Sequence, residues 1–325
     1  MTTYKEIKGT NIEVLESDPS NPLDGQVWYN STDNVLKGNV GTPVVAWSTV
    51  NSLNQARTSV SGAGTATAAI VVGGYSTTYI ADTEVWNGAN WTEVNNLNTA
   101  RSSNGSAGTY TAALTFGGSK APPPPGNASL NITETWNGTN WTEVNDLNTS
   151  RRSGSGVGTN TAALFIGGNT PPGTNKVESW NGTNWTETTD LNTPRYASAG
   201  AGIQTAALLI GGAGGTPLTE LWNGSNWTEV NDLNTGREAL MGSGVQTSAL
   251  AYGGAASPAG VTESWNGTNW TEVNDLNTGR LRAASAGATN TSALASGGVP
   301  APGSPDHVAL VEQFVGLTTK TFTDS

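Results

Sequence analysis

The amino-acid sequence predicts an all-β protein: a β-propeller of six blades, preceded by a short N-terminal β-hairpin leader. Three observations predict this fold. A motif of two tryptophans around Asn-Gly recurs at intervals of 42 to 50 residues, the size of one propeller blade. Asn-Gly between apolar segments is a strong signal for a hairpin turn. The 325 residues include 42 Gly and only 12% charged residues, a composition rich in turns and poor in solvated helices.

Each period contains four short segments, and we expect each segment to form one strand of a four-stranded blade. The first is rich in small residues and follows an arginine, as in "TSVSGAG" after Arg57. The second is apolar and ends in Gly-Gly, as in "TAAIVVGG" from Thr67. The third reads Glu-x-Trp, and the fourth, "WTEV", starts with the second tryptophan. The tryptophans that mark the fourth segments are Trp47, Trp91, Trp141, Trp185, Trp227 and Trp270.

The sequence contains six Gly-Gly strands, which predicts six blades. One blade buries too little apolar surface to be stable alone, and a ring of blades buries each face against its neighbour. We expect the two tryptophans of each motif to pack within a blade or between blades. Two segments could close the ring as the fourth strand of the last blade, residues 46–50 ("AWSTV") and residues 319–325 ("TKTFTDS").

The arginine-led strand, the apolar Gly-Gly strand, the Glu-x-Trp strand and the tryptophan strand together resemble the kelch repeat. The resemblance covers residues 43–325, and the spaced Gly-Gly and aromatic residues recur in six copies. It implies a β-propeller whose Gly-rich strand is innermost. Here that strand is rich in Ser, Gly and Ala, as crowding near the axis requires.

Residues 1–42 do not fit the repeat. They contain a turn-rich lead and a predicted hairpin, "QVWYN" against "VLKGNV" around residues 31–34. Residues 17–40 resemble leaders of bacteriophage virion proteins, especially tail-fibre and other appendage proteins, and the near-identical "WNGTNWTEVNDLNT" repeats are similar to those of proteins from the same viruses. The resemblance implies a leader that attaches the propeller to other virion proteins or to copies of itself, because an isolated hairpin is hardly stable alone.

Composition excludes several classes of function. The chain has no Cys and one His, so we expect neither a zinc-thiolate site nor the copper site of oxidase propellers. A net charge of −11 argues against nucleic-acid binding, which depends on Lys and Arg. No apolar run is long enough for membrane insertion, and the N-terminus lacks the apolar core of a signal peptide. We expect no cofactor, no metal and no enzymatic activity, because carboxylates repeated in every blade do not define one catalytic site.

Two charged positions recur once per blade. Periodicity favours a structural role, in which each arginine forms an ion pair that ties neighbouring blades. The alternative is a charged ring at the channel mouth that binds an anion. The repeated positions are Arg57, Arg101, Arg151, Arg195, Arg237 and Arg280, with Glu84, Glu134, Glu178, Glu220, Glu263 and Glu312.

Other repeated residues also have a structural and a functional interpretation. The tryptophans could stack on sugars, but their regular register favours packing between strands. The aspartates of the "DLNT" segments could bind calcium, but one carboxylate per blade favours a turn cap within the same segment. These aspartates are Asp146, Asp190, Asp232 and Asp275.

Variation within the repeat concentrates in the loops between Gly-Gly and Glu-x-Trp. These loops should emerge on the same face of the ring as the "NDLNTxR" connections, opposite the "WNGTNW" turns. Diverse loops on a constant scaffold are typical of recognition surfaces, although surface loops also drift freely. The candidate binding residues on this face are Tyr75, Tyr79, Lys120, Asn127, Asn169, Lys176, Asp306 and His307.

Together these observations predict a phage virion protein, located on the particle surface in multiple copies, whose propeller binds a host-surface glycan or protein. Two alternatives remain open. One is a capsid decoration or tail-assembly protein without a host ligand, and the other is a cellular kelch-type interaction module. The leader argues against the cellular module.

Overall fold

A computed structural model describes residues 13–17, 27–32, 35–38, 46–120, 128–301 and 306–316. The described residues contain strands and turns but no helix. The chain divides into two compact units, Ala46–Val315 on the one hand and Met1–Val45 with Gly316–Ser325 on the other.

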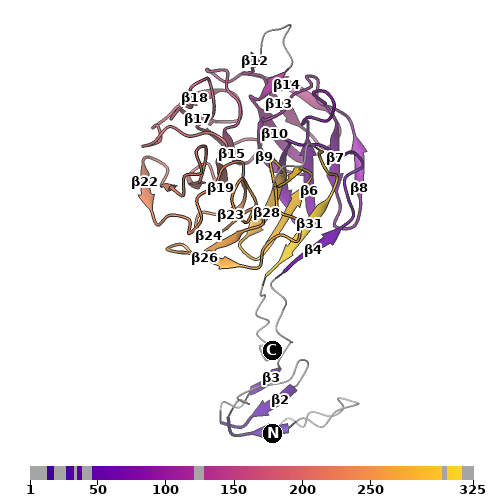
Figure 1. The fold of residues 1–325 in the computed structure, drawn as a ribbon, viewed down its shortest axis with the longest axis vertical. Helices are drawn as coiled ribbons and strands as arrows, with labels where there is room; N and C mark the ends of the chain where they lie inside the picture. The colour runs from indigo at the N-terminus through magenta and orange to yellow at the C-terminus, as the bar shows by residue number, and fades with distance from the viewer. Residues whose placement is uncertain are drawn as a thin grey trace. The chain divides into compact units, whose positions relative to one another are not determined.

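The larger unit is a six-bladed kelch-like β-propeller, as the sequence predicts (Figure 1). Each blade is a four-stranded antiparallel sheet. In blades 1 to 5 the strands lie in chain order from the axis outward, whereas blade 6 takes its outer strand from the beginning of the propeller. From inner to outer strand, the blades are: blade 1, β5 (Ser61–Thr65), β6 (Ala68–Val72), β7 (Thr83–Trp86) and β8 (Trp91–Val94); blade 2, β9 (Gly105–Thr109), β10 (Ala112–Phe116), β13 (Thr133–Trp136) and β14 (Trp141–Val144); blade 3, β15 (Ser155–Gly158), β16 (Ala163–Ile166), β17 (Val177–Trp180) and β18 (Trp185–Glu187); blade 4, β19 (Ala199–Ile203), β20 (Ala206–Ile210), β21 (Thr219–Trp222) and β22 (Trp227–Val230); blade 5, β23 (Met241–Val245), β24 (Ser248–Tyr252), β25 (Thr262–Trp265) and β26 (Trp270–Val273); and blade 6, β28 (Ala284–Thr289), β29 (Ser292–Ser296), β31 (Val311–Val315) and β4 (Ala46–Val50).

Strand β4 closes the ring. It pairs antiparallel with β31, from Ala46 opposite Val315 to Val50 opposite Val311. Of the two segments that the sequence offered for closure, residues 46–50 therefore form the outer strand of blade 6, and residues 319–325 lie outside the described residues. Trp47 takes the place that the second tryptophan holds in the other blades, and its side chain is buried.

The tryptophan pairs link each blade to itself and to its neighbour. The indole N–H of the first tryptophan donates to a carbonyl in the inner hairpin of the same blade, as Trp86 Nε1 does to Ala66 O at 3.1 Å. In four blades the second tryptophan reaches across to the preceding blade, where a buried threonine hydroxyl accepts its N–H at 3.0–3.2 Å. In the other two, Trp227 Nε1 donates to the carbonyl of Thr189 at 3.2 Å, and Trp91 Nε1 is buried with no partner among the described residues. These threonine bonds join Trp141 to Thr83, Trp185 to Thr133, Trp270 to Thr219 and Trp47 to Thr262.

The Gly-Gly pair and the repeated arginine form a second link between blades. The N–H of Gly74 in blade 1 donates to the backbone carbonyl of Arg101, which enters blade 2, at 2.8 Å. A side chain on Gly73 would place its Cβ 2.5 Å from the same carbonyl oxygen, and Gly73 has a φ of +61°. The close approach therefore requires glycine. The equivalent bond recurs at all six junctions between blades.

The leader contains more pairing than the sequence predicted. Strands β2 (Val27–Asn30) and β3 (Val35–Gly38) form the predicted antiparallel hairpin. Strand β1 (Glu13–Leu15) adds to β2 in parallel, which makes a three-stranded sheet in the order β1-β2-β3. The parallel strand has no local turn signal in the sequence, because its partner lies 15 residues further along.

Candidate functional site

Each blade presents two different ends. Because the strands alternate in direction, the loops from second to third strand and the connections between blades lie at one end, which we call the loop face. The hairpin turns lie at the other end, the turn face. Two short strand pairs extend the loop face: β11 (Ser119–Lys120) with β12 (Ala128–Ser129), and β27 (Arg280–Leu281) with β30 (Val299–Pro300).

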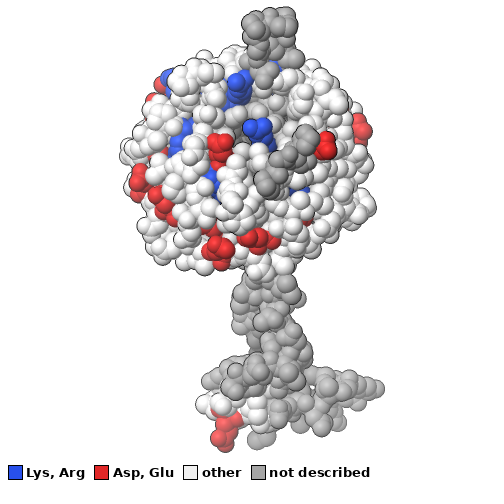
Figure 2. Space-filling view, in the orientation of Figure 1, with Lys and Arg blue, Asp and Glu red and all other residues white. Residues whose placement is uncertain are grey.

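A cavity of about 980 Å³ opens at the centre of the loop face. We call it the funnel. It is lined by the residues that follow each repeated arginine, by the starts of the six inner strands, and by loop residues from blades 1, 2 and 6. Figure 2 shows Lys and Arg atoms near the centre of this view and acidic atoms both beside them and at the periphery. A smaller opening of about 130 Å³ lies among the glycines at the far ends of the inner strands.

A ring of backbone hydrogen bonds encircles the funnel. Six residues, one per blade, each donate an N–H to the carbonyl of the equivalent residue in the neighbouring blade at 2.7–2.9 Å, and the ring closes on itself. All six have a positive φ of 51–57°, although none is glycine. Such a backbone costs free energy and persists only where its surroundings hold it. The ring residues are Ser59, Ser103, Ser153, Ala197, Ala239 and Arg282.

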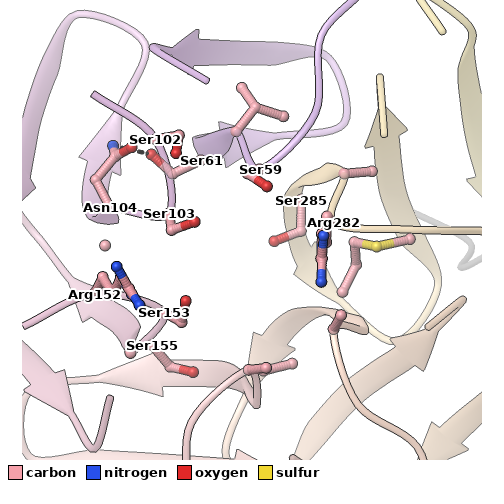
Figure 3. Close-up of a pocket in the computed structure, with 18 of the residues that line it drawn as sticks. Ser59, Ser61, Ser102, Ser103, Asn104, Arg152, Ser153, Ser155, Arg282 and Ser285 are labelled. Carbon is pink, nitrogen blue, oxygen red and sulfur yellow. Dashed lines mark hydrogen bonds between the residues drawn. The ribbon is translucent and has the colours of Figure 1, made fainter. Parts of the chain in front are cut away.

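The side chains of this ring are not uniform. Three consecutive blades contribute the hydroxyl groups of Ser59, Ser103 and Ser153, which lie around the opening in Figure 3. Blades 4 and 5 contribute only methyl groups, and blade 6 contributes the exposed guanidinium of Arg282. Within this ring, three neighbouring positions therefore carry hydroxyls and another carries a positive charge.

The position immediately after each repeated arginine differs in every blade. Its backbone pairs with the residue after Gly-Gly, for example Thr58 with Tyr75 at 2.8 and 2.9 Å. Five of the six residues at this position line the funnel. In blade order they are Thr58, Ser102, Arg152, Tyr196, Glu238 and, outside the lining, Leu281.

Three of the predicted binding residues come together at the boundary of blades 6 and 1. The ring of Tyr79 stands edge-on to that of Tyr75, with centroids 5.5 Å apart, and the ring of His307 does the same at 5.8 Å. His307 Nε2 donates to the carbonyl of Ser76 at 2.7 Å, which joins the loop of blade 6 to that of blade 1. All three aromatic residues line the funnel.

The other predicted binding residues lie elsewhere. Lys120 is exposed in β11, and Lys176 forms an exposed ion pair with Glu187 at 2.7 Å. Asn169 shares a backbone bridge with Arg152, and Asp306 is exposed next to His307 in sequence. None of these four lines the funnel, and Asn127 lies outside the described residues.

The repeated arginines and glutamates form six ion pairs whose side chains are at most 2% exposed. None lines the funnel, so the alternative of a charged ring at the channel mouth is wrong. Each pair also lies within one blade rather than between two: Arg151 Nη2 donates to Glu178 Oε1 at 3.0 Å, and Nη1 to the carbonyls of Gly167 and Lys176. The pair fastens the connection that enters a blade to the third strand of that blade.

Burial dominates the electrostatics of these pairs. It lowers the pKa of Arg151 to about 10, against the opposing attraction of Glu178. It also lowers the pKa of Arg101, with Glu134 opposing. The cost of desolvating the arginines therefore outweighs the attraction of the glutamates, as is common for buried ion pairs. The pairs contribute by fixing the position of the entering connection rather than by a net electrostatic gain.

The aspartates of the "DLNT" segments do not cap their own turns, contrary to prediction. Asp146 Oδ1 accepts the backbone N–H of Thr133 at 3.2 Å, and Asp232 and Asp275 accept those of Thr219 and Thr262. Each bond joins the connection after the fourth strand to the start of the third strand in the same blade. Within the described ranges, no three acidic or histidine side chains are close enough to hold a metal ion.

Sequence reasoning missed four functional candidates in the funnel, Arg152, Tyr196, Glu238 and Arg282. A signal for the first three was present: the repeated arginine is the same in all six copies and the next residue differs in all six. That abrupt change marks the point where the chain leaves the packed scaffold.

No helix able to span a membrane occurs in the described segments.

Comparison with known proteins supports the fold alone. No protein-family model matches the chain, and no curated protein matches it significantly. Among solved structures it is similar to YjhT, a kelch-repeat protein, with a TM-score of 0.68 over 82% of this chain and 97% of that one. At 13% sequence identity, the two chains share the architecture of a six-bladed kelch-like propeller.

Proposed function

We propose that this protein is a non-catalytic appendage protein of a phage particle whose funnel binds a host-surface glycan or protein. The observation that carries the proposal is the contrast at the repeated arginine. The arginine is identical in all blades and buried, while the next residue is different in all blades and faces the funnel in five of them. Packing does not require this diversity, and recognition of one asymmetric ligand does.

The chemistry of the funnel suits a saccharide. Its lining combines many serine hydroxyls with the phenols of Tyr75, Tyr79 and Tyr196. Sugars present hydroxyls at their edges and C–H groups on their faces, and aromatic rings with a polar end suit both. The volume of about 980 Å³ lies at the upper end of the range for small-ligand sites.

The location on a phage particle rests on the resemblance of residues 17–40 to virion leaders and on the style of the repeats. In this proposal the leader pairs with another virion protein, and many copies display their funnels together. Weak single-site binding then becomes strong attachment, because linked sites rebind before they separate.

The test uses the full-length protein and two matched tyrosine substitutions. Tyr75 is 36% exposed in the funnel, and Tyr110 is 41% exposed in a hairpin turn on the opposite face. Binding to immobilised bacterial surface polysaccharides and cell-envelope proteins is measured by biolayer interferometry. We expect Tyr75→Ala to weaken binding about tenfold, and Tyr110→Ala to leave it unchanged.

Equal loss in both variants, or no binding to any host material, would overturn the proposal of recognition. Mass spectrometry of purified particles tests the location separately. Detection of the chain in particles supports an appendage, and its absence from particles overturns the virion assignment. A chain that is present in particles but whose funnel is covered by another virion protein in cryo-EM reconstructions would be a decoration or assembly protein.

A further inference from the structure

The described lining of the funnel holds two arginines and one carboxylate, on a strongly acidic protein. The chain carries a net charge of −11. Six of its arginines are neutralised in buried ion pairs. The other Lys and Arg of the described propeller residues are Lys120, Arg152, Lys176, which pairs with Glu187, and Arg282, and both arginines of this set line the funnel. The described lining holds one carboxylate, that of Glu238, which accepts the backbone N–H of Gly214 at 2.9 Å.

Backbone hydrogen bonds fix the main chain of Arg282, whereas its guanidinium is exposed. Its N–H donates to Ala239 O and its carbonyl accepts from Ser59 N, both at 2.9 Å, with a φ of 57°. The side chain is exposed and makes no hydrogen bond or ion pair with any residue that the structure describes. Figure 3 shows it at the edge of the opening, beside Ser285. Ala197 and Ala239 adopt the same backbone conformation, so the ring does not require an arginine there.

An aromatic surface belongs to the same part of the funnel wall, to which backbone hydrogen bonds connect Arg282. Ser59, which donates to Arg282 O, follows Thr58, and Thr58 is bonded through its backbone to Tyr75. The rings of Tyr79 and His307 stand edge-on to Tyr75 at interplanar angles of 83° and 82°, which fixes its orientation. One sector of the funnel, at the boundary of blades 6 and 1, thus combines a guanidinium, a hydroxyl and a held aromatic ring.

We propose that this sector is a subsite for an acidic saccharide, in which Arg282 binds the carboxylate of the sugar and Tyr75 packs against its ring. A planar guanidinium donates two parallel hydrogen bonds to a carboxylate, which a neutral sugar cannot accept with the same strength. Ser59 and Ser285 supply hydroxyls for the remaining sugar oxygens. The inference rests on the proposed function, because it names the chemical class of ligand for the same funnel.

The experiment compares one saccharide with and without its charge. The probes are a short oligogalacturonate and the same oligosaccharide with its carboxylates methyl-esterified, and their affinities for the full-length protein are measured by calorimetry. We expect the acid to bind about tenfold more tightly than the ester, a difference of about 1.4 kcal/mol, because a hydrogen bond to a charged group is stronger than one to a neutral group. Added salt should weaken binding of the acid and leave that of the ester nearly unchanged.

The variants assign the preference to the sector. Arg282→Gln should reduce the preference for the acid to about twofold or less, and Arg282→Lys should retain part of it. Lys176→Gln removes an exposed charge outside the funnel and should retain the full preference. Thermal unfolding of each variant, followed by tryptophan fluorescence, shows that the propeller is intact. Full preference in folded Arg282→Gln, or equal binding of acid and ester, overturns the subsite.

The outcomes separate this inference from the proposed function. Binding of both probes that depends on Tyr75 but not on charge overturns the acidic subsite and leaves saccharide binding in place. Binding of neither probe, together with no binding to host polysaccharides or envelope proteins, overturns both.

Discussion

The buried ion pairs give a sharp test of how the repeat stabilises a blade. Blade 3 offers two glutamates that face each other on adjacent strands, since Glu178 on β17 is the pairing partner of Glu187 on β18. The Glu178 carboxylate accepts from Arg151 Nη2 at 3.0 Å and from Asn148 N and Nδ2 at 2.7 and 2.8 Å. Among the described residues, the Glu187 carboxylate accepts only from Lys176 at the surface, where the two side chains are 49% and 37% exposed.

We expect Glu178→Gln to lower the free energy of unfolding by about 3–5 kcal/mol, because it leaves a buried guanidinium without a counterion. Glu187→Gln should change it by at most about 1 kcal/mol, since exposed ion pairs contribute little. The substitutions are identical and near-isosteric, so cavity formation does not separate them. Arg151→Met combined with Glu178→Leu should recover only part of the loss, because the carbonyls of Gly167 and Lys176 then lose their donor.

Urea unfolding followed by tryptophan fluorescence measures all of these variants. A loss of 3–5 kcal/mol moves the midpoint by about 1–2 M for a slope near 3 kcal/mol/M. A Glu178→Gln midpoint within about 0.3 M of that of Glu187→Gln would refute the assignment of the repeated pair as the fastener of the blade.

Three further substitutions test the links between blades by the same unfolding assay. Val311→Thr should stabilise the protein by about 0.5–1 kcal/mol, because Trp91 Nε1 is buried without a partner among the described residues, where four other blades offer a threonine hydroxyl; a less stable variant contradicts this interpretation. Trp47→Ala should cost about 3–5 kcal/mol and make the closing strand sensitive to protease. Gly73→Ala should cost more than Gly214→Ala: both have positive φ, but only the former brings a Cβ within 2.5 Å of a backbone oxygen. Equal losses would show that strain rather than contact sets the penalty.

The scaffold could be predicted from the sequence because its constraints are local and repeated. Gly-Gly, Asn-Gly and the tryptophan spacing each specify a backbone geometry, and six copies of the first and five of the Trp-Asn-Gly hairpin leave little choice of fold. The sequence did not decide which of two segments forms the closing strand, because that strand depends on a pairing between residues far apart in the chain, Ala46 with Val315. In hindsight, Trp47 favoured residues 46–50, since residues 319–325 contain no tryptophan to fill the outer position.

The candidate site could be predicted only in part. Tyr75, Tyr79 and His307 were chosen as variable loop residues, and the fold brings them together because blade 6 returns next to blade 1. Lys120 and Lys176 were chosen on the same basis but lie outside the funnel. Loop variability alone does not show whether a side chain faces the axis or the periphery. That direction is set by the backbone bridge after each repeated arginine, which appears only in three dimensions.

The organisation of the six junctions explains how a near-exact repeat can carry an asymmetric site. The links at the axis are made by main-chain atoms: the second glycine of Gly-Gly donates to an arginine carbonyl, and the funnel ring joins N–H to carbonyl from blade to blade. Neither link depends on the side chains of the two residues after the arginine. These positions can therefore change from serine to tyrosine, glutamate or arginine without altering the ring, as they do in this chain. Substitutions can then change the lining of the funnel one blade at a time, while the buried pairs and tryptophans hold the scaffold constant.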